Sequence, residues 1–224
     1  MTKKKNLGES AEQSADAAEA PESRKPAIQT YTIPLNRPVQ LKHEGGDTIN
    51  ELQVIEPYGY MMRGFGLGDI VNANDEAFAK LFPKITKNVP VDYQLIKEID
   101  IDIFADLQAG LMNMLSDIIG TGELVKEHNG ALILTLPHAL EVDGQTITEL
   151  HFPRRVQTSV VRGHGMQALR VRDIECLCDA AARTCTNADL SANDYKNMKL
   201  GNLLGLGDIV AYWLNEKETD ADFL

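Results

Sequence analysis

The sequence has few cysteines, few aromatic residues and no long uninterrupted apolar run. Its three cysteines, Cys176, Cys178 and Cys185, are odd in number and lie close together. Such a set does not suit a disulfide framework and is more typical of a protein in a reducing cytosol. No stretch reaches the roughly 18 to 20 apolar residues that cross a bilayer, and no signal-peptide apolar region follows the basic start of the chain. We therefore expect a protein that acts inside a cell, with no membrane partner.

Positive charge is also scarce. Lysine and arginine contribute 22 residues against 33 aspartates and glutamates, so the formal net charge is -11. A nucleic-acid-binding surface needs clustered basic side chains that neutralise phosphates, and this balance argues against one. The remaining composition is that of an ordinary globular protein, and an acidic surface favours solubility or a partner with basic segments.

The two ends of the chain differ in composition from the middle. Residues 1–28 are rich in Ala, Glu, Ser and Lys and have no large apolar residue between Leu7 and Ile28. Such a segment cannot bury enough apolar area to offset the entropy lost on ordering. We expect a disordered tail there and a short acidic end at 217–224. The part between them is predicted to form two units, residues 29–122 and 128–216.

The first unit begins with the pattern of a β-hairpin. Apolar runs at 31–41 and 49–54 flank a Gly-Gly-Asp turn at 45–47. Pro34 and Pro38 predict a first strand that is irregular or lies at a sheet edge.

Helices are expected to follow a break at Arg63-Gly64-Phe65-Gly66. One begins near Asp75 and is predicted to end at Pro83. A longer helix from Asp102 closes near Gly120. Its apolar residues step by three and four along one stripe, namely Phe104, Leu107, Leu111, Met114 and Ile118.

The same order of patterns returns after residue 130. The string Thr-Ile-x-Glu-Leu occurs at 48–52 and at 146–150, and Arg-Gly-x-Gly occurs at 63–66 and at 162–165. Both the order and the nearly constant offset predict a tandem duplication of one α+β unit, a β-hairpin followed by a small set of helices.

This alignment also pairs the residues before and after those strings. It pairs Leu35–Leu41 with Leu134–Leu140 and Ile103-Phe104 with Asp194-Tyr195. From Tyr195 a helical stripe is predicted to continue through Met198, Leu203, Leu206, Val210 and Trp213. The hexapeptide Gly-Leu-Gly-Asp-Ile-Val at 66–71 and 205–210 does not fit the offset, and we interpret that identity as coincidental.

The sequence offers little that supports catalysis or a metal site. Cys-x-Cys stands alone, without the paired spacing of zinc sites, so Cys178 and Cys185 are expected to be buried thiols on one helix face. The glycines at 64–68 lack the Lys-Ser/Thr of a phosphate loop. The histidines fall in predicted turns or strands and form no repeated pattern: His43, His128, His138, His151 and His164. We expect no enzyme, no cofactor and no bound metal.

Two charged clusters leave two interpretations open. Glu98, Asp100 and Asp102 alternate with isoleucines, which suits the solvated face of an extended segment or the N-terminal charge of the next helix. One region of the second unit is basic, through Arg154, Arg155, Arg162, Arg170 and Arg172. It is either a protein-binding patch or ordinary solvated charge.

The ordered motifs of the two units resemble the small tail assembly chaperones of Mu-like contractile-tailed bacteriophages. In the first unit they comprise Leu35, Pro38, Val39, Leu41, Ile49, Glu51, Leu52, Glu56, Pro57, Arg63, Gly64 and Phe104. In the second unit they comprise Pro137, Leu140, Ile147, Glu149, Leu150, Arg162, Gly163, Asp194 and Tyr195. The second unit has Phe152-Pro153-Arg154 where Glu-Pro is expected, and members of that family usually consist of one unit.

The resemblance implies a protein without catalysis that coats the helical tape measure protein and helps to recruit tail tube subunits. It implies work in the host cell cytoplasm, possible self-association and release before the particle matures. Apolar helix faces would cover those of the tape measure protein. The residues assigned to partner binding are Arg63, Phe104, Leu107, Leu111, Arg162, Tyr195, Met198 and Trp213.

Two alternatives remain. A structural tail or baseplate subunit would stay in the finished particle. A cytosolic enzyme would have a pocket between the units, lined by His164 or by a cysteine with a base in reach.

Overall fold

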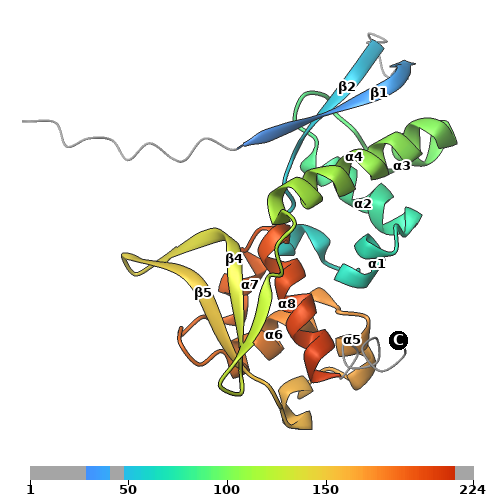
Figure 1. Cartoon of the computed structure of the whole chain (residues 1–224). Helices are drawn as coiled ribbons and strands as arrows, with labels where there is room; N and C mark the ends of the chain where they lie inside the picture. The colour runs from blue at the N-terminus through green and yellow to red at the C-terminus, as the bar shows by residue number, and fades with distance from the viewer. Residues whose placement is uncertain (1–28, 41–47, 215–224) are drawn as a thin grey trace, which may run out of the picture.

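The structure of the chain, a computed structural model, describes residues 29–40 and 48–214. A small antiparallel sheet with helices is followed by a second sheet with helices, which confirms the predicted α+β class (Figure 1). We call residues 29–119 the first half and residues 125–214 the second half. The predicted tail at 1–28, the turn at 45–47 and the acidic end at 217–224 lie outside the described residues.

The first half begins with the predicted hairpin. Its elements are β1 (Thr30–Gln40), β2 (Thr48–Ile55), the 3-10 helix η1 (Gly59–Met62), α1 (Leu67–Val71), α2 (Asp75–Ile85), α3 (Tyr93–Glu98) and α4 (Ile101–Ile119). The pairing of β1 with β2 shifts register between Pro34 and Val39. Proline has no N–H to donate to a ladder, so Pro38 accounts for this irregularity, as predicted.

The second half begins with a strand that the sequence patterns did not reveal. Its elements are β3 (Val125–His128), β4 (Ala131–Val142), β5 (Gln145–Pro153), the 3-10 helix η2 (Thr158–Val161), α5 (Met166–Arg170), α6 (Ile174–Thr184), α7 (Ala192–Lys196) and α8 (Leu200–Trp213). β3 pairs with β4, so the second half includes residues before the predicted start at 128. The turn at Asp143-Gly144 joins β4 to β5, with φ of 50° and 77° at these residues.

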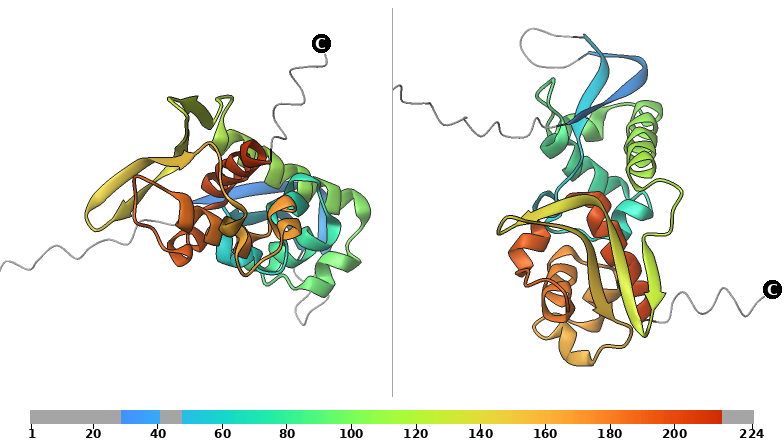
Figure 2. Two further views of the ribbon diagram at one scale, coloured as in Figure 1. Left: turned by 90° about the horizontal axis from the view of Figure 1, so that it is seen from below. Right: turned by 60° about the vertical axis from the view of Figure 1, so that its left-hand side comes forward.

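A long helix covers the sheet in each half. α4 lies against β1 and α8 lies against β4 (Figure 1, Figure 2). Both contacts depend on a glycine that lets the helix approach the strand closely. A Cβ on Gly110 would lie 2.4 Å from Cγ2 of Ile33, and a Cβ on Gly205 would lie 2.3 Å from Cδ1 of Leu134. Neither strand residue could keep its place beside an alanine.

The helical elements of the two halves follow one another at one spacing. η1, α1, α2, α3 and α4 begin at residues 59, 67, 75, 93 and 101, and their counterparts begin at 158, 166, 174, 192 and 200, each 99 residues later. Unusual backbone conformations obey the same spacing: Gly64 and Gly163 both have φ of 93°, and Ala73 and Arg172 have φ of 51° and 53°.

A side-chain clamp also occurs once in each half. Asn88 accepts a hydrogen bond from Gln53 N–H at 2.9 Å and donates to the carbonyl of Glu51 at 3.0 Å. Asn187 accepts from His151 N–H at 2.8 Å and donates to the carbonyl of Glu149 at 3.0 Å. Each asparagine thus ties the chain that follows a helix to the strand β2 or β5.

Several predicted helix boundaries and pairings differ in the structure. Pro83 lies inside α2 and does not end it; only Lys84 and Ile85 follow, and a single backbone hydrogen bond is lost. Tyr195 lies in the short helix α7, and a new helix begins at Leu200, so α8 rather than the Tyr195 segment is the counterpart of α4. Regular pairing resumes at Val39 in β1 and at Leu140 in β4. By strand register Leu140 is therefore the counterpart of Val39, whereas the sequence comparison paired it with Leu41.

Candidate functional site

A hollow lies between α1, α4 and α8, where the two halves meet. It has a volume of about 440 Å³. Its apolar wall comes from both halves and consists of Leu67, Ile70, Val71, Met112, Leu115, Ile119, Leu124 and Leu204. Val71 is 51% exposed, an unusual degree for a valine beside a largely apolar surface. We call this hollow the interhalf groove.

Polar side chains line the rest of the interhalf groove. Glu123, Asp208 and Ser116 provide oxygen atoms, and Arg172 provides a guanidinium. Arg172 has a left-handed backbone conformation, and its carbonyl accepts a hydrogen bond from Leu67 N–H at 3.0 Å. Gly207 makes room for this arrangement, since a Cβ there would lie 3.3 Å from both Cδ of Arg172 and Cδ1 of Leu67.

The identical hexapeptides at 66–71 and 205–210 both contribute to this groove. The first supplies Leu67, Ile70 and Val71, and the second supplies Gly207 and Asp208. The sequence interpretation treated the identity as coincidental and assigned no site residue to either segment. The paired hexapeptides were the sequence signal that could have pointed to the groove.

A second apolar surface lies where α3 meets α4. Ile101 is 86% exposed, and it lines a hollow of about 260 Å³ together with Phe104 and Ile96. A smaller hollow of about 170 Å³, lined in part by Ile99 and Pro38, lies beside it. We call residues 98–102 the α3–α4 corner.

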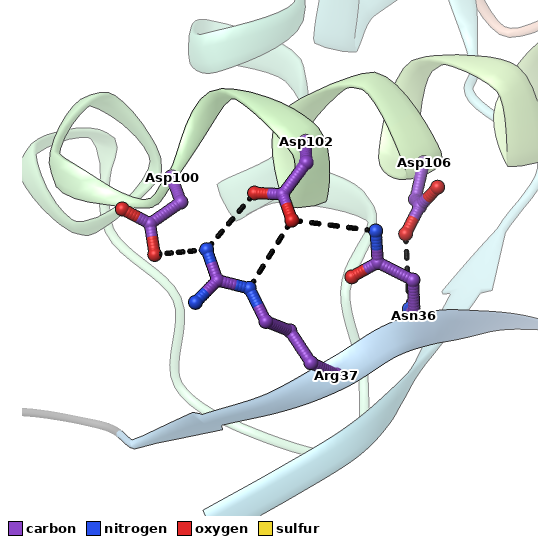
Figure 3. Close-up of polar contacts among 5 residues, drawn as sticks. All are labelled: Asn36, Arg37, Asp100, Asp102 and Asp106. Atoms are coloured by element: carbon purple, nitrogen blue, oxygen red, sulfur yellow. Dashed lines mark hydrogen bonds and ion pairs between the residues drawn. The ribbon is translucent and has the colours of Figure 1, made fainter.

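Charged residues connect the α3–α4 corner to β1. Arg37 pairs with Asp100 and Asp102, and Asn36 donates its backbone N–H to Asp106 at 2.9 Å (Figure 3). The hydrogen bond from Arg37 lowers the pKa of the Asp102 carboxyl. Asp100 is the N-cap of α4 and Asp102 lies in its first turn, so these two carboxylates provide N-terminal charge as one interpretation expected, whereas Glu98 is the last residue of α3.

The two halves are joined by a buried carboxylate. Glu56 is 2% exposed and accepts a hydrogen bond from Gly201 N–H at 2.8 Å. Its second oxygen lies 2.7 Å from Nε2 of His138 and 3.7 Å from Nζ of Lys199. The carboxylate of Glu56, which belongs to the first half, thus lies at the N-terminus of α8. Its negative charge interacts favourably with the helix dipole there.

The partner-binding residues assigned from sequence fall into two groups. Leu107, Leu111, Tyr195 and Met198 are buried in the core, so they are not surface contacts in this fold. Their apolar spacing reflects packing against the chain's own sheets and helices. The others are at least partly accessible: Arg63, Phe104, Arg162 and Trp213.

The accessible residues do not lie in the interhalf groove. Phe104 lines the hollow at the α3–α4 corner. The carbonyl of Arg162 accepts a hydrogen bond from Arg183, and the indole of Trp213 donates to the carbonyl of Pro153 at 2.8 Å. Trp213 therefore ties the end of α8 to β5, which is a structural role.

The thiols and histidines of the described residues show no assembled catalytic group. Cys176 and Cys178 are fully buried on α6, and burial raises their pKa to about 11 and about 12. Cys185 follows the helix and is half-buried, so it does not share their face. His164 lies 2.8 Å from Asp179, but neither His164 nor a cysteine lines any of the hollows described above.

Residues 29–40 and 48–214 contain no group of three or more His, Cys, Asp or Glu side chains placed to hold a metal ion. Within the same ranges, no helix combines the length and the apolar character that spanning a bilayer requires.

Comparison with known proteins finds no match. This holds for protein-family models, for curated protein sequences and for solved structures. The function is therefore argued from the groove and from the residue patterns alone.

Proposed function

We propose that this chain is a bacteriophage tail assembly chaperone that binds an apolar helix face of the tape measure protein in the interhalf groove. The observation that carries the proposal is the groove itself. It is about 440 Å³ in volume, is walled by aliphatic side chains from both halves and leaves Val71 half exposed. Amphipathic helices are recognised by laying their apolar side chains into grooves of this kind.

The charges around the groove fit a helix that also carries basic residues. Glu123 and Asp208 would lie beside lysines or arginines that flank the helix's apolar stripe. The chain's net charge of -11 would keep a coated, aggregation-prone tape measure protein in solution. The proposed role requires no catalysis and places the chain in the host cytoplasm, with tail tube subunits recruited afterwards.

We infer in addition that the two halves arose by tandem duplication. The common 99-residue spacing of five helical elements supports this inference, as do the matching left-handed residues. The clamps of Asn88 and Asn187 are harder to explain by chance, because each makes the same pair of hydrogen bonds to a strand. In this view the single groove lies between two copies of a unit that elsewhere stands alone.

The test is binding of a helical fragment of the tape measure protein encoded beside this chain. Val71 and Ser116 line the groove and are exposed, so Val71→Asp and Ser116→Arg should change the groove without unfolding the chain. Each is expected to weaken binding by about tenfold or more. Val171 is 45% exposed and does not line the groove, so Val171→Asp is the matched control and should bind normally. Equal binding by all four chains would rule out the groove as the site.

A further inference from the structure

The contact between the two halves has a defined backbone geometry. Leu200 N–H donates to the carbonyl of Pro57 at 2.7 Å, and Gly59 N–H donates to the carbonyl of Met198 at 3.0 Å. Leu200 is completely buried at this contact. The segment after β2 is thereby docked on the corner between α7 and α8, with Glu56 against Gly201.

Each of these two surfaces has a counterpart elsewhere in the chain. The α3–α4 corner corresponds to the α7–α8 corner at the 99-residue spacing, so Ile101 stands at the start of α4 where Leu200 stands at the start of α8. The segment after β5, which contains Arg155 and Val156, corresponds to the segment after β2. Leu200 is fully buried, whereas Ile101 is 86% exposed.

Both counterparts have surfaces suited to a contact. The segment after β5 lines a hollow of about 320 Å³ that includes Arg155, Val156 and Gln157. The α3–α4 corner is flanked by the hollows of about 260 Å³ and 170 Å³ on either side of Ile99. Ile101 lines the larger of these two hollows, and an isoleucine with 86% of its surface exposed beside a hollow is unusual for a surface that stays in water.

The charges of the two free surfaces are complementary. Inside the chain an acid after β2, Glu56, faces Lys199 at the corner and His138 of β4. At the free surfaces the signs are exchanged, because the exposed Arg155 follows β5 and Asp100, which pairs with Arg37, lies at the α3–α4 corner with 63% of its side chain exposed. A second copy of the same chain therefore offers each surface a partner of opposite charge.

We propose that copies of this chain associate head to tail, with the Arg154-Arg155-Val156 segment of one copy docked on the α3–α4 corner of the next. Ile101 would be buried there in the way that Leu200 is buried within the chain. Because the two surfaces differ, the contact is heterologous and leaves a free surface at each end, so it builds an open row of copies, or a ring where the rotation between copies closes. The association needs no tape measure protein, so it can be tested independently of the chaperone role proposed above.

One residue sets a limit on how closely the copies approach. A Cβ on Gly59 would lie 2.8 Å from the carbonyl oxygen of Lys196, and the counterpart of Gly59 in the second half is Thr158. The contact between copies is therefore more open at this point than the contact within the chain. It depends correspondingly more on Ile101 and on the charged side chains.

The first experiment is sedimentation velocity on the purified full chain over a concentration series up to about 1 mM. The natural chain should show an average mass that rises with concentration beyond that of a dimer. Ile101→Ser should weaken association by about tenfold or more, with thermal unfolding unchanged because Ile101 is exposed. Val171→Asp, a change at another exposed apolar residue, should associate like the natural chain. A natural chain that remains monomeric or stops at a dimer would overturn the proposal, as would normal association of Ile101→Ser.

The second experiment uses exchanged charges. Arg155→Glu and Asp100→Arg should each lower self-association by about tenfold. An equimolar mixture of the two variants should recover it, because the introduced glutamate of one chain then meets the introduced arginine of the other, while the natural pair forms at alternate contacts. Asp100 makes no side-chain capping hydrogen bond on α4, but its replacement removes the ion pair with Arg37, so thermal unfolding of Asp100→Arg is compared with that of the natural chain. A mixture that associates no better than its components would contradict the docking geometry.

Discussion

The carboxylate of Glu56 accepts a hydrogen bond from the backbone N–H of Gly201 at 2.8 Å, across 145 residues of the chain. Glu56 belongs to the Glu-Pro motif that follows the first hairpin, and Gly201 lies in the first turn of α8. The motif therefore fixes the position of one half on the other and so shapes the interhalf groove.

Removing this carboxylate is expected to destabilise the whole chain. Glu56→Ala leaves the Gly201 N–H without its acceptor and removes the carboxylate beside His138 and Lys199, and should lower the free energy of unfolding by about 2–4 kcal/mol. Glu51→Ala, at an exposed glutamate of β2, should change it by less than about 0.5 kcal/mol. Denaturant unfolding measures both, and equal effects would show that Glu56 contributes nothing beyond an ordinary surface charge.

The two asparagine clamps should contribute similarly to stability. Asn88→Ala and Asn187→Ala each remove two hydrogen bonds to a strand and should each cost about 1–2 kcal/mol of unfolding free energy. Asn113→Ala, on the exposed face of α4, should be neutral or slightly stabilising because alanine favours helix. A loss of unfolding free energy in only one of the two variants would contradict the equal contribution of the two clamps.

Gly205 is expected to tolerate no side chain. Gly205→Ala would place a Cβ 2.3 Å from Cδ1 of Leu134, so the Leu134 side chain must rotate or α8 must shift, and we expect a loss of about 1–3 kcal/mol in unfolding free energy. Gly122→Ala is the control, since a Cβ at Gly122 meets nothing within 4 Å. A Gly205→Ala chain as stable as the control would mean that the helix is less closely packed than described.

The three thiols should differ sharply in reactivity. Burial raises the pKa of Cys176 to about 11 and that of Cys178 to about 12, so both stay protonated and shielded at pH 8. With a chromogenic thiol reagent, the folded chain should show one accessible thiol, Cys185, and the unfolded chain should show three. Rapid reaction of all three before unfolding would contradict the burial of α6.

The same two thiols make stability depend on alkaline pH. Their pKa is raised in the folded state relative to the ordinary value of 9.0, so their contribution is complete below pH 9. It is lost as pH rises through about 11 to 12, because the unfolded chain releases these protons first. Cys178→Ala should flatten the fall in melting temperature over this range, and an unchanged slope would count against the assignment.

The sequence predicted local structure better than it predicted the site. The hairpins, the irregular first strand and the long helix that closes the first half follow from alternation, proline positions and helical spacing, and all three are confirmed. β3 was missed because four residues with one buried side chain form no pattern. Leu107, Leu111, Tyr195 and Met198 were taken for a binding surface because an apolar helical stripe does not reveal whether its partner is the same chain or another.

The interhalf groove could not have been predicted from periodicity. Its wall joins α1, α4 and α8, whose proximity depends on Glu56, Arg172 and the backbone contacts of Pro57. Such long-range contacts produce no local pattern in the sequence. The duplication and the chaperone role remain proposals, and each rests on a different set of observations.

The most direct test of the chaperone role follows the natural chain through phage assembly. Affinity capture from infected cells before lysis should recover the chain together with the tape measure protein, while mass spectrometry of purified particles should detect no stoichiometric copy of it. A chain that is present in finished particles at a fixed number of copies would contradict the account and identify it as a structural tail subunit.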